Sequence, residues 1–369
     1  MPDPRLEKLA DLLVHYSVKI RPRDKVVIQG EAIAAPLLSA VYARVLQAGG
    51  YPIVLPELPE IDELFYRHAS GEQLQYVSEI DRLVRERHDV LIQIDGASNT
   101  KALSNVDPKK ISLRAQARAV LSTILMQRTA AGELRWVYTI FPTHAYAQDA
   151  EMSLREFEDF FYQACMPDLH NPVGYWQRVA AQQDRIVKWL SGKQRVHVKA
   201  PGTDLRLSIA GRPFINCAGN FNLPDGEVFT APVEDSVEGQ VYFSYPAIYG
   251  GKEVAGVRLW FEQGKVVRAS AEKNEEFLQA TLDTDEGARR AGEFAIATNE
   301  GITRFTRQIL FDEKIGGSFH LALGASYPES GGVNQSAIHW DMICDLRAGG
   351  EIWVDEQLLY KEGKFVMAA

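Results

Sequence analysis

The chain has 369 residues, 46% hydrophobic and 24% charged, a composition typical of a folded globular protein and not of a disordered or fibrous one. Its net charge of -9, from 49 acidic and 40 basic residues, argues against a nucleic-acid or acidic-membrane partner, since phosphate binding requires a concentrated positive field. No apolar run approaches the ~20 residues of a membrane span, the first residues lack a signal-peptide core, and three scattered cysteines suit a reducing compartment, so we expect a cytoplasmic protein.

The first half of the chain alternates between helical and strand patterns. Leucines at helical spacing over residues 4–16 precede an apolar strand pattern at Lys25–Gly30. Further helices are predicted at 33–48, 60–86, 107–129, 153–165 and 174–191, and further strands at 51–56, 89–96 and 135–142. This alternation predicts an α/β domain with a mostly parallel, Rossmann-like sheet. The segment after the first strand, QGEAIAAP, lacks the three spaced glycines of a dinucleotide site, so no nucleotide cofactor is expected.

The second half changes to short β-type segments broken by turns. We place the boundary at SGKQ, giving an α/β domain over 1–193 and a β-rich α+β domain over 194–369. WFEQGKVVR and LLYKEGKFV predict hairpins with turns at Gln263–Gly264 and Glu362–Gly363. This second domain carries every candidate metal ligand.

His339 and Asp341 give the sharpest local signal. Their segment, SAIHWDMICDL, has the residue types of a strand. Because strand side chains alternate, His339 and Asp341 would point into one site, with Ile338, Trp340 and Met342 packed behind them. The alternative is a surface histidine beside a carboxylate.

Glu227 and Glu293 each open an apolar segment, VFTAP and FAIAT. A buried carboxylate needs a cation or a hydrogen-bond donor, so both residues are candidate ligands. For Glu293 the alternative is a salt bridge to Arg289 or Arg290. We expect the neighbouring Asp225 to be a solvated turn residue.

His320 lies in the apolar run SFHLALG, after two glycines, Gly316 and Gly317, that permit close backbone approach. A hydrogen-bonded core histidine is the alternative to a ligand. Tyr327, seven residues later, could point its phenol into the same site or simply close a turn before Pro328.

The candidates together are two imidazoles and three carboxylates: Glu227, Glu293, His320, His339 and Asp341. Such a set suits a pair of divalent ions and predicts a dinuclear metallohydrolase.

The segments NLPDGEVFTAP, RRAGEFAI, LFDEKIGGSFHLALGASYP and IHWDM together resemble the thermophilic-type metalloaminopeptidases, the family of aminopeptidases T and S. The resemblance implies that the five candidates bind two divalent ions, zinc, cobalt, magnesium or manganese, and that Tyr327 is the active-site tyrosine. It also implies short peptide substrates with a free N-terminus, and a homodimer that encloses its sites in an internal cavity.

The chemistry implied is hydrolysis by a hydroxide bridging two ions about 3.5–4 Å apart. We expect Asp341 or Glu227 to bridge the ions, Tyr327 to stabilise the oxyanion, and Glu293 or Glu227 to pass a proton to the leaving amine. The α-amino group of the peptide would bind one ion, which restricts cleavage to one N-terminal residue at a time.

Two departures from the family pattern lie beside the site. Lys314 stands where the family usually has asparagine, with a longer gap to His320, and the nineteen residues from His320 to His339 form a short segment. We expect these departures to affect substrate preference.

Two alternative functions stay open. A mononuclear iron dioxygenase of hydroxylated pyridines needs two histidines and one carboxylate, such as Asp341, and is disfavoured by the retained glutamates. A non-catalytic binding homologue is the other alternative.

Overall fold

The computed structural model describes residues 3–366, and packing divides the chain into two compact units. Residues up to 177 together with 218–225 form the first unit, and residues 178–217 together with 226 onward form the second. The domain boundary predicted between residues 193 and 194 stays a prediction. Among the described residues, no helix has both the length and the apolar character needed to cross a membrane.

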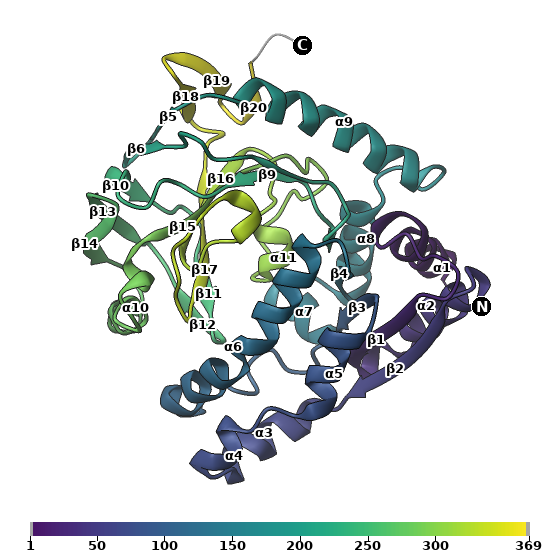
Figure 1. Ribbon diagram of the computed structural model, residues 1–369. Coiled ribbons are helices and arrows are strands. Elements are labelled where there is room, and N and C mark those ends of the chain that lie inside the picture. Colours follow the sequence, from purple (N-terminus) through teal and green to yellow (C-terminus); the bar gives the residue numbers. More distant parts are fainter. Residues whose placement is uncertain (1–2, 367–369) are drawn as a thin grey trace. The chain divides into compact units, whose positions relative to one another are not determined.

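The first unit contains a parallel sheet of five strands in the order β2-β1-β3-β4-β8 (Figure 1). The strands are β1 (Lys25–Glu31), β2 (Tyr51–Glu57), β3 (Val90–Asp95), β4 (Arg135–Ile140) and β8 (Asn222–Leu223). The predicted Rossmann-like α/β sheet is thereby confirmed. The short β8 was not predicted, because its two residues carry no periodic signal.

Helices cover both faces of this sheet. Val84 of α5 packs with Val27 and Leu91 on one face. Val26 and Ile28 point to the opposite face, where α2 packs, and are also fully buried. The helical elements of this part of the chain are α1 (Pro4–Asp11), η1 (Leu12–Ser17), η2 (Ala32–Ala34), α2 (Ala35–Gln47), α3 (Pro59–His68), α4 (Gly71–Gln75), α5 (Glu79–Arg87), α6 (Pro108–Ala130), α7 (His144–Asp149), α8 (Leu154–Cys165) and α9 (Pro172–Leu190), the last of which continues into the second unit.

Local sequence signals set the ends of several of these helices. Asp107 accepts a hydrogen bond from the Lys109 amide and precedes Pro108 at the first turn of α6. Ser153 and Glu156 form a reciprocal capping box at the start of α8. These short-range interactions explain why the predictions at 107–129 and 153–165 agree with α6 and α8. The helical stretch predicted at 60–86 is divided into α3, α4 and α5, and α7 was not predicted.

The second unit is built from antiparallel strands (Figure 1). An eight-stranded sheet has the order β14-β13-β10-β6-β5-β18-β19-β20, a five-stranded sheet the order β17-β16-β15-β9-β7, and β11 pairs with β12. The strands are β5 (Arg195–Ala200), β6 (Thr203–Ser208), β7 (Ile215–Cys217), β9 (Glu227–Thr230), β10 (Glu238–Tyr242), β11 (Ala247–Tyr249), β12 (Lys252–Val254), β13 (Arg258–Glu262), β14 (Lys265–Ser270), β15 (Ala291–Ala297), β16 (Ser318–Gly324), β17 (His339–Asp345), β18 (Glu351–Val354), β19 (Gln357–Lys361) and β20 (Lys364–Phe365). The helical elements are α10 (Glu275–Leu282), η3 (Gly287–Arg289), α11 (Ile309–Asp312) and η4 (Pro328–Ser330).

Both predicted hairpins are confirmed. Gln263 and Gly264, between β13 and β14, have positive φ angles of 48° and 74°. Glu362 and Gly363, between β19 and β20, have φ angles of 47° and 81°. Two consecutive positive φ values match the twist of paired strands, which is why a glycine in this position predicts such turns.

One face of the five-stranded sheet packs into the hydrophobic core of the second unit. Phe294, Phe319 and Trp340 belong to the same buried cluster as Val198 and Leu205 of the eight-stranded sheet. Each such buried side chain contributes about 1.5–3 kcal/mol of transfer free energy. The predicted burial of Trp340 behind the site is confirmed, as is that of the neighbouring Met342. The opposite face of β9, β15, β16 and β17 is therefore left for polar residues.

Candidate metal centre

The predicted ligands lie on four neighbouring strands. Glu227 begins β9, Glu293 lies in β15, His320 in β16, and His339 and Asp341 in β17. Asp341 pairs with Ala322, which pairs on its other side with Glu293. At the far end of β15, Glu227 pairs with Ala297. Because side chains alternate along each strand, this register puts all of the ligand candidates on one face.

Three alanines stand between the ligand candidates on that face. Ala295 pairs with His320 and Ala297 pairs with Glu227. Ala322 pairs with Glu293 on one side and with Asp341 on the other. All three are fully buried. Their short side chains leave the space above the sheet to the longer carboxylates and imidazoles. Sequence inspection missed this feature, although the alternating alanines of the segments EFAIA and HLALG contain it.

Two glycines fix the entry of the chain into the ligand-bearing strands. Gly226, before Glu227, has φ +126°, and an added Cβ would lie 2.7 Å from Cβ of Asn299. Gly317, before β16, has φ +96°, and an added Cβ would lie 2.5 Å from the side chain of Arg347. Both positions exclude a larger residue, in agreement with the close approach expected at the glycines before His320.

Glu293 lies at the middle of the cluster. Its Oε1 is 3.3 Å from Nε2 of His320, and its Oε2 is 3.4 Å from Nε2 of His339. Oε2 of Glu227 lies 3.4 Å from the same His320 nitrogen. Oδ2 of Asp341 lies 3.6 Å from Nε2 of His339. The ligand atoms thus form two groups that share Glu293, one with Glu227 and His320 and one with His339 and Asp341.

Backbone carbonyl groups orient both imidazoles. Nδ1 of His320 lies 2.8 Å from the carbonyl oxygen of Glu313, and Nδ1 of His339 lies 2.8 Å from that of Ala325. In each case Nδ1–H donates to the carbonyl oxygen, so Nε2 is the nitrogen that faces the carboxylates. Such a second hydrogen bond is usual for histidines that bind metal ions through the other nitrogen.

The structure adds two residues that sequence reasoning did not place in the site. The carboxylate of Glu313 forms a third group with His320 and Asp341. Lys314 has a completely buried side chain, and its Nζ lies 3.6 Å from Oε1 of Glu227 and contacts Oε1 of Glu313. The signal available in the sequence was the charged pair within the apolar segment ILFDEKIGG.

Burial and the charges of neighbouring groups shift the pKa values of the cluster in opposite directions. Burial alone would lower the pKa of His320, but its hydrogen bond to Glu293 and the carboxylate of Glu227 raise it to about 10. Burial raises the pKa of Glu227 to about 8, and the positive charge of Lys314 opposes this rise. The metal-free cluster therefore holds protons that a divalent ion would displace on binding.

The donor set fits divalent metal ions. Oε2 of Glu227 and Oδ1 of Asp341 are buried and accept no hydrogen bond among the described residues. Buried carboxylate oxygens normally have a partner, and a cation supplies one. Oxygen and imidazole nitrogen donors are the ligands that suit zinc, manganese, cobalt and magnesium between them.

Tyr327 lies beside this cluster at the start of η4. Its ring centroid is 5.0 Å from that of His339 and 5.7 Å from that of Phe229. The His339 ring lowers the pKa of Tyr327, but burial and the Glu293 carboxylate outweigh it and raise the pKa above its usual value. The phenol therefore stays protonated and able to donate a hydrogen bond at neutral pH.

The structure tests two expectations about residues near the ligands, the partner of Arg289 and the exposure of Asp225. Arg289 pairs with Asp283, 2.7 Å away, and so is not the predicted alternative partner of Glu293. Asp225 is fully buried, and its carboxylate accepts a hydrogen bond of 2.8 Å from the Gly219 amide. The prediction of a solvated turn residue at Asp225 was therefore wrong, because the local Pro-Asp-Gly pattern does not show that the turn is covered.

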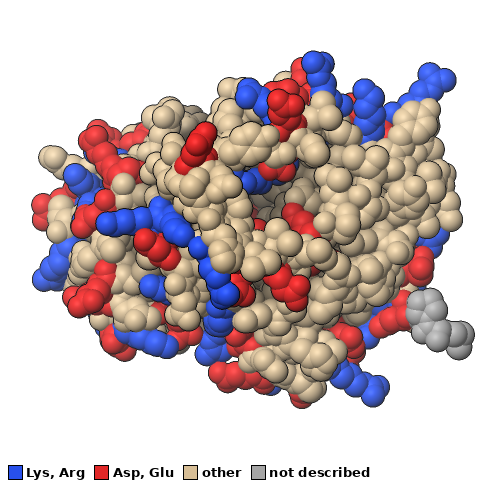
Figure 2. Space-filling model, turned by 90° about the horizontal axis from the view of Figure 1, so that it is seen from below, with Lys and Arg blue, Asp and Glu red and all other residues tan. Residues whose placement is uncertain are grey.

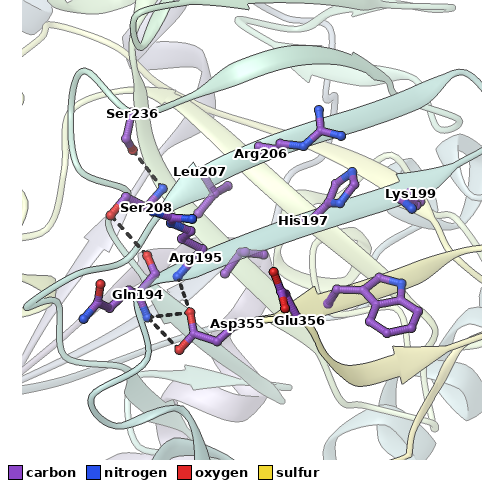
Figure 3. A pocket seen from close by; sticks show the side chains of 12 residues that line it. Gln194, Arg195, His197, Lys199, Arg206, Leu207, Ser208, Ser236, Asp355 and Glu356 are labelled. Atoms are coloured by element: carbon purple, nitrogen blue, oxygen red, sulfur yellow. Dashed lines mark hydrogen bonds between the residues drawn. The ribbon is translucent and has the colours of Figure 1, made fainter.

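A separate hollow of about 760 Å³ lies on the eight-stranded sheet (Figure 3). Strands β5, β6 and β18 carry most of the twelve residues that line it, and none of these twelve is a metal-ligand candidate. Two of its polar residues have local partners. His197 lies 2.9 Å from Asp204. Asp355 accepts hydrogen bonds from the backbone amides of Gln194 and Arg195 (Figure 3). The buried carboxylate and imidazole cluster is the better candidate for chemistry.

Comparison with known proteins agrees with this geometry. The family model of thermophilic metalloproteases, M29, matches residues 2–365. The chain belongs to the thermophilic metalloprotease family. Aminopeptidase 2 of Geobacillus stearothermophilus is 29% identical over 94% of each sequence, and aminopeptidase T of Thermus thermophilus is 31% identical over 72% of each. The solved structure of wild-type AmpT from Thermus thermophilus covers 99% of both chains, with a TM-score of 0.86 and 26% identity.

Membership of the thermophilic metalloprotease family confirms the predicted enzyme class, a metallopeptidase, and implies a divalent metal ion. The 2,5-dihydroxypyridine dioxygenase of Pseudomonas putida KT2440 covers 98% of the chain with a TM-score of 0.58, but at 13% identity it shows a shared fold and nothing more.

Proposed function

We propose that this protein is an aminopeptidase that removes N-terminal residues from short peptides with two divalent ions. The observation that carries the proposal is the position of Glu293, whose two carboxylate oxygens face two different histidines. A carboxylate shared between two ligand groups suits a pair of ions better than a single one. Asp341 faces the same two histidines, with Oδ1 3.9 Å from Nε2 of His320 and Oδ2 3.6 Å from Nε2 of His339. Glu293 therefore joins Asp341 and Glu227, the residues expected from sequence, as a candidate bridging carboxylate.

The ligand groups suggest how the ions are held. One position would use Glu293, His339 and Asp341, and the other would use His320 with Glu227 and the shared Glu293. Glu313 forms a further group with His320 and Asp341, so it is an additional candidate ligand on the side of His320. When bound, two such ions supply a hydroxide nucleophile at neutral pH and polarise the scissile carbonyl. Zinc, cobalt, manganese and magnesium are all compatible with these donors.

The remaining roles follow from position and protonation state. Tyr327 is protonated and adjacent to His339, so its phenol would donate a hydrogen bond to the oxyanion that forms during peptide hydrolysis. Glu227 remains a candidate for accepting a proton and passing it to the leaving amine, because its carboxylate lies within the ligand cluster. Glu293 could share this role, but its position between the histidines favours ligation.

Several features support peptides as substrates and a cytoplasmic location. The named relatives are aminopeptidases, and we infer the same specificity for a free N-terminus in this chain. The cysteines Cys165, Cys217 and Cys344 are buried and form no disulfide bond, as in proteins of reducing compartments. On the face shown in Figure 2, lysine and arginine side chains are mixed with acidic ones, which does not suit a polyanionic partner. We also propose a homodimer, as the family resemblance implies.

The decisive experiment combines metal analysis with an activity assay. Purified protein should contain about two divalent ions per chain and release chromophore from aminoacyl anilides. Chelation should abolish this activity, and cobalt, zinc, manganese or magnesium should restore it. One iron per chain with cleavage of a hydroxylated pyridine ring would instead support the dioxygenase. The absence of both bound metal and chelator sensitivity would support a non-catalytic homologue.

A further inference from the structure

Lys314 is the one lysine or arginine with a buried side chain among residues 3–366. It follows α11 and precedes β16, and none of its side-chain surface is exposed. Removing an ammonium group from water is costly unless carboxylates compensate it. The placement of this charge inside the ligand cluster therefore requires a reason.

Lys314 forms ion pairs with two carboxylates of the cluster. Its Nζ lies 3.6 Å from Oε1 of Glu227 and also contacts the carboxylate of Glu313. Both carboxylates belong to ligand groups that contain His320. The group formed by Glu293 with His339 and Asp341 includes neither of these partners, although Asp341 also lies in the group of Glu313 and His320.

A fixed positive charge affects the two sides of the cluster differently. It stabilises the ionised forms of Glu227 and Glu313, and so holds these carboxylates in place in the metal-free protein. A divalent ion that binds to the same carboxylates must approach the ammonium and is repelled by it, strongly so in a site of low dielectric constant. An ion held by Glu293, His339 and Asp341 does not bind the two carboxylates that pair with Lys314, although the ammonium also lowers the pKa of Asp341.

Solvent exposure also favours binding of the first ion on the side of His339. The His339 side chain keeps 25% of its surface exposed, whereas that of His320 keeps 1%. The position near His339 is therefore the more open one, and neither carboxylate that contacts the ammonium belongs to its ligand group.

We propose that Lys314 makes the two metal positions unequal, so that the first ion binds tightly at Glu293, His339 and Asp341. The second ion binds more weakly around His320, because it shares Glu227 and Glu313 with the ammonium. This inference rests on the proposed two-ion function. Lys314 is then a positioning residue for the carboxylates and sets the metal concentration at which the second position fills.

The test is a titration of the chelator-stripped full chain with Mn²⁺, followed by isothermal calorimetry and by melting temperature. Wild-type protein should show a tight step and a weaker step. Lys314→Met should strengthen the weaker step at least about tenfold and change the tight step by less than about threefold. The metal-free variant should also melt at a lower temperature than metal-free wild type, because two buried carboxylates lose their cation.

Matched variants separate charge from packing. Lys314→Arg keeps the positive charge and should preserve the difference between the steps. Lys273→Met removes an exposed lysine that pairs with Glu253 at 2.9 Å and should leave both steps unchanged. If Lys314→Met does not fold, Lys314→Gln removes the charge, retains hydrogen-bond donors for the carboxylates, and should strengthen the weaker step in the same way.

The outcomes distinguish this inference from the proposed function. A single step in wild type that becomes two in Lys314→Met would support the role of Lys314 while contradicting two ions in the native enzyme. If wild type shows two steps and Lys314→Met leaves both unchanged or weakens the second, the inference is overturned. The proposed function then stays intact. One step in both proteins, or none, would overturn both.

Discussion

The carboxylate of Glu293 lies between two histidines from neighbouring elements of one sheet, 3.3 Å from Nε2 of His320 through Oε1 and 3.4 Å from Nε2 of His339 through Oε2. The antiparallel register produces this arrangement, because Glu293 pairs with Ala322, which in turn pairs with Asp341. Both of these ligand groups include Glu293, and changes at Glu293 should therefore affect both.

Glu293→Gln should reduce aminopeptidase activity at least about 100-fold and lower the metal content, since an amide offers one neutral oxygen where the carboxylate offers two charged ones. Metal analysis and anilide hydrolysis on the same preparation would measure this. Glu275→Gln, on the surface helix α10, is the matched control and should retain normal activity. Full metal content with near-normal activity in Glu293→Gln would contradict the assignment.

Tyr327→Phe should lower kcat by about 10²–10³-fold with little change in metal content, because it removes one hydrogen-bond donor and keeps the ring packed beside His339 and Phe229. Steady-state kinetics and metal analysis would check this. A change confined to KM would show that the phenol contacts the substrate equally in the ground state.

Ala322→Leu should prevent metal binding while leaving the fold largely intact. Ala322 lies on the ligand face between Glu293 and Asp341, where a larger side chain would occupy the space of the ions. The cost in stability should be about 1–3 kcal/mol, as for other overpacked sites. Circular dichroism would verify the fold and calorimetry the loss of metal binding. Normal metal affinity in this variant would show that the ions lie elsewhere.

Metal binding should release protons and weaken as pH falls. The carboxylates around His320 raise its pKa to about 10 in the metal-free protein, so its Nε2 must lose a proton before it can bind an ion. Each displaced proton should reduce the apparent affinity up to about tenfold per unit of pH below that value. Calorimetry in buffers of different ionisation enthalpy measures the number of protons released. Binding without proton release would show that His320 is already neutral in the metal-free protein.

Asp312 provides a pH-dependent contribution to stability outside the ligand set. Burial raises the pKa of Asp312 to about 8, against hydrogen bonds from Thr306 that lower it. The folded state thus binds a proton that the unfolded state loses near pH 4, and the associated stability declines by about 1.4 kcal/mol per pH unit until pH 8.

Asp312→Asn cannot lose a proton in this range. Its stability relative to wild type should therefore increase between pH 5 and pH 8 and remain constant at higher pH. Denaturant unfolding of the metal-free proteins across pH 5–9 would measure the difference. Parallel pH profiles for the two proteins would show that Asp312 is already ionised at pH 5.

The sequence by itself determined the features that depend on short-range order. The alternation of apolar helix and strand patterns predicted the parallel sheet of the first unit, since periodicity reflects which face of an element is buried. Alternation of side chains along one strand placed His339 and Asp341 on the same face. Gly264 and Gly363 predicted two hairpins, because the turns require a positive φ that glycine adopts readily.

Only the tertiary structure decided which distant residues meet. Strand β8 joins the sheet of the first unit although it follows the first strands of the second, a long-range pairing without a local pattern. The sequence placed Lys314 beside the site, but only the structure shows that its buried ammonium pairs with Glu227 and with Glu313. Register between strands, and not the order of residues along them, makes Glu293 and Asp341 carboxylates that both histidines share, because register is set by the packing of the whole sheet.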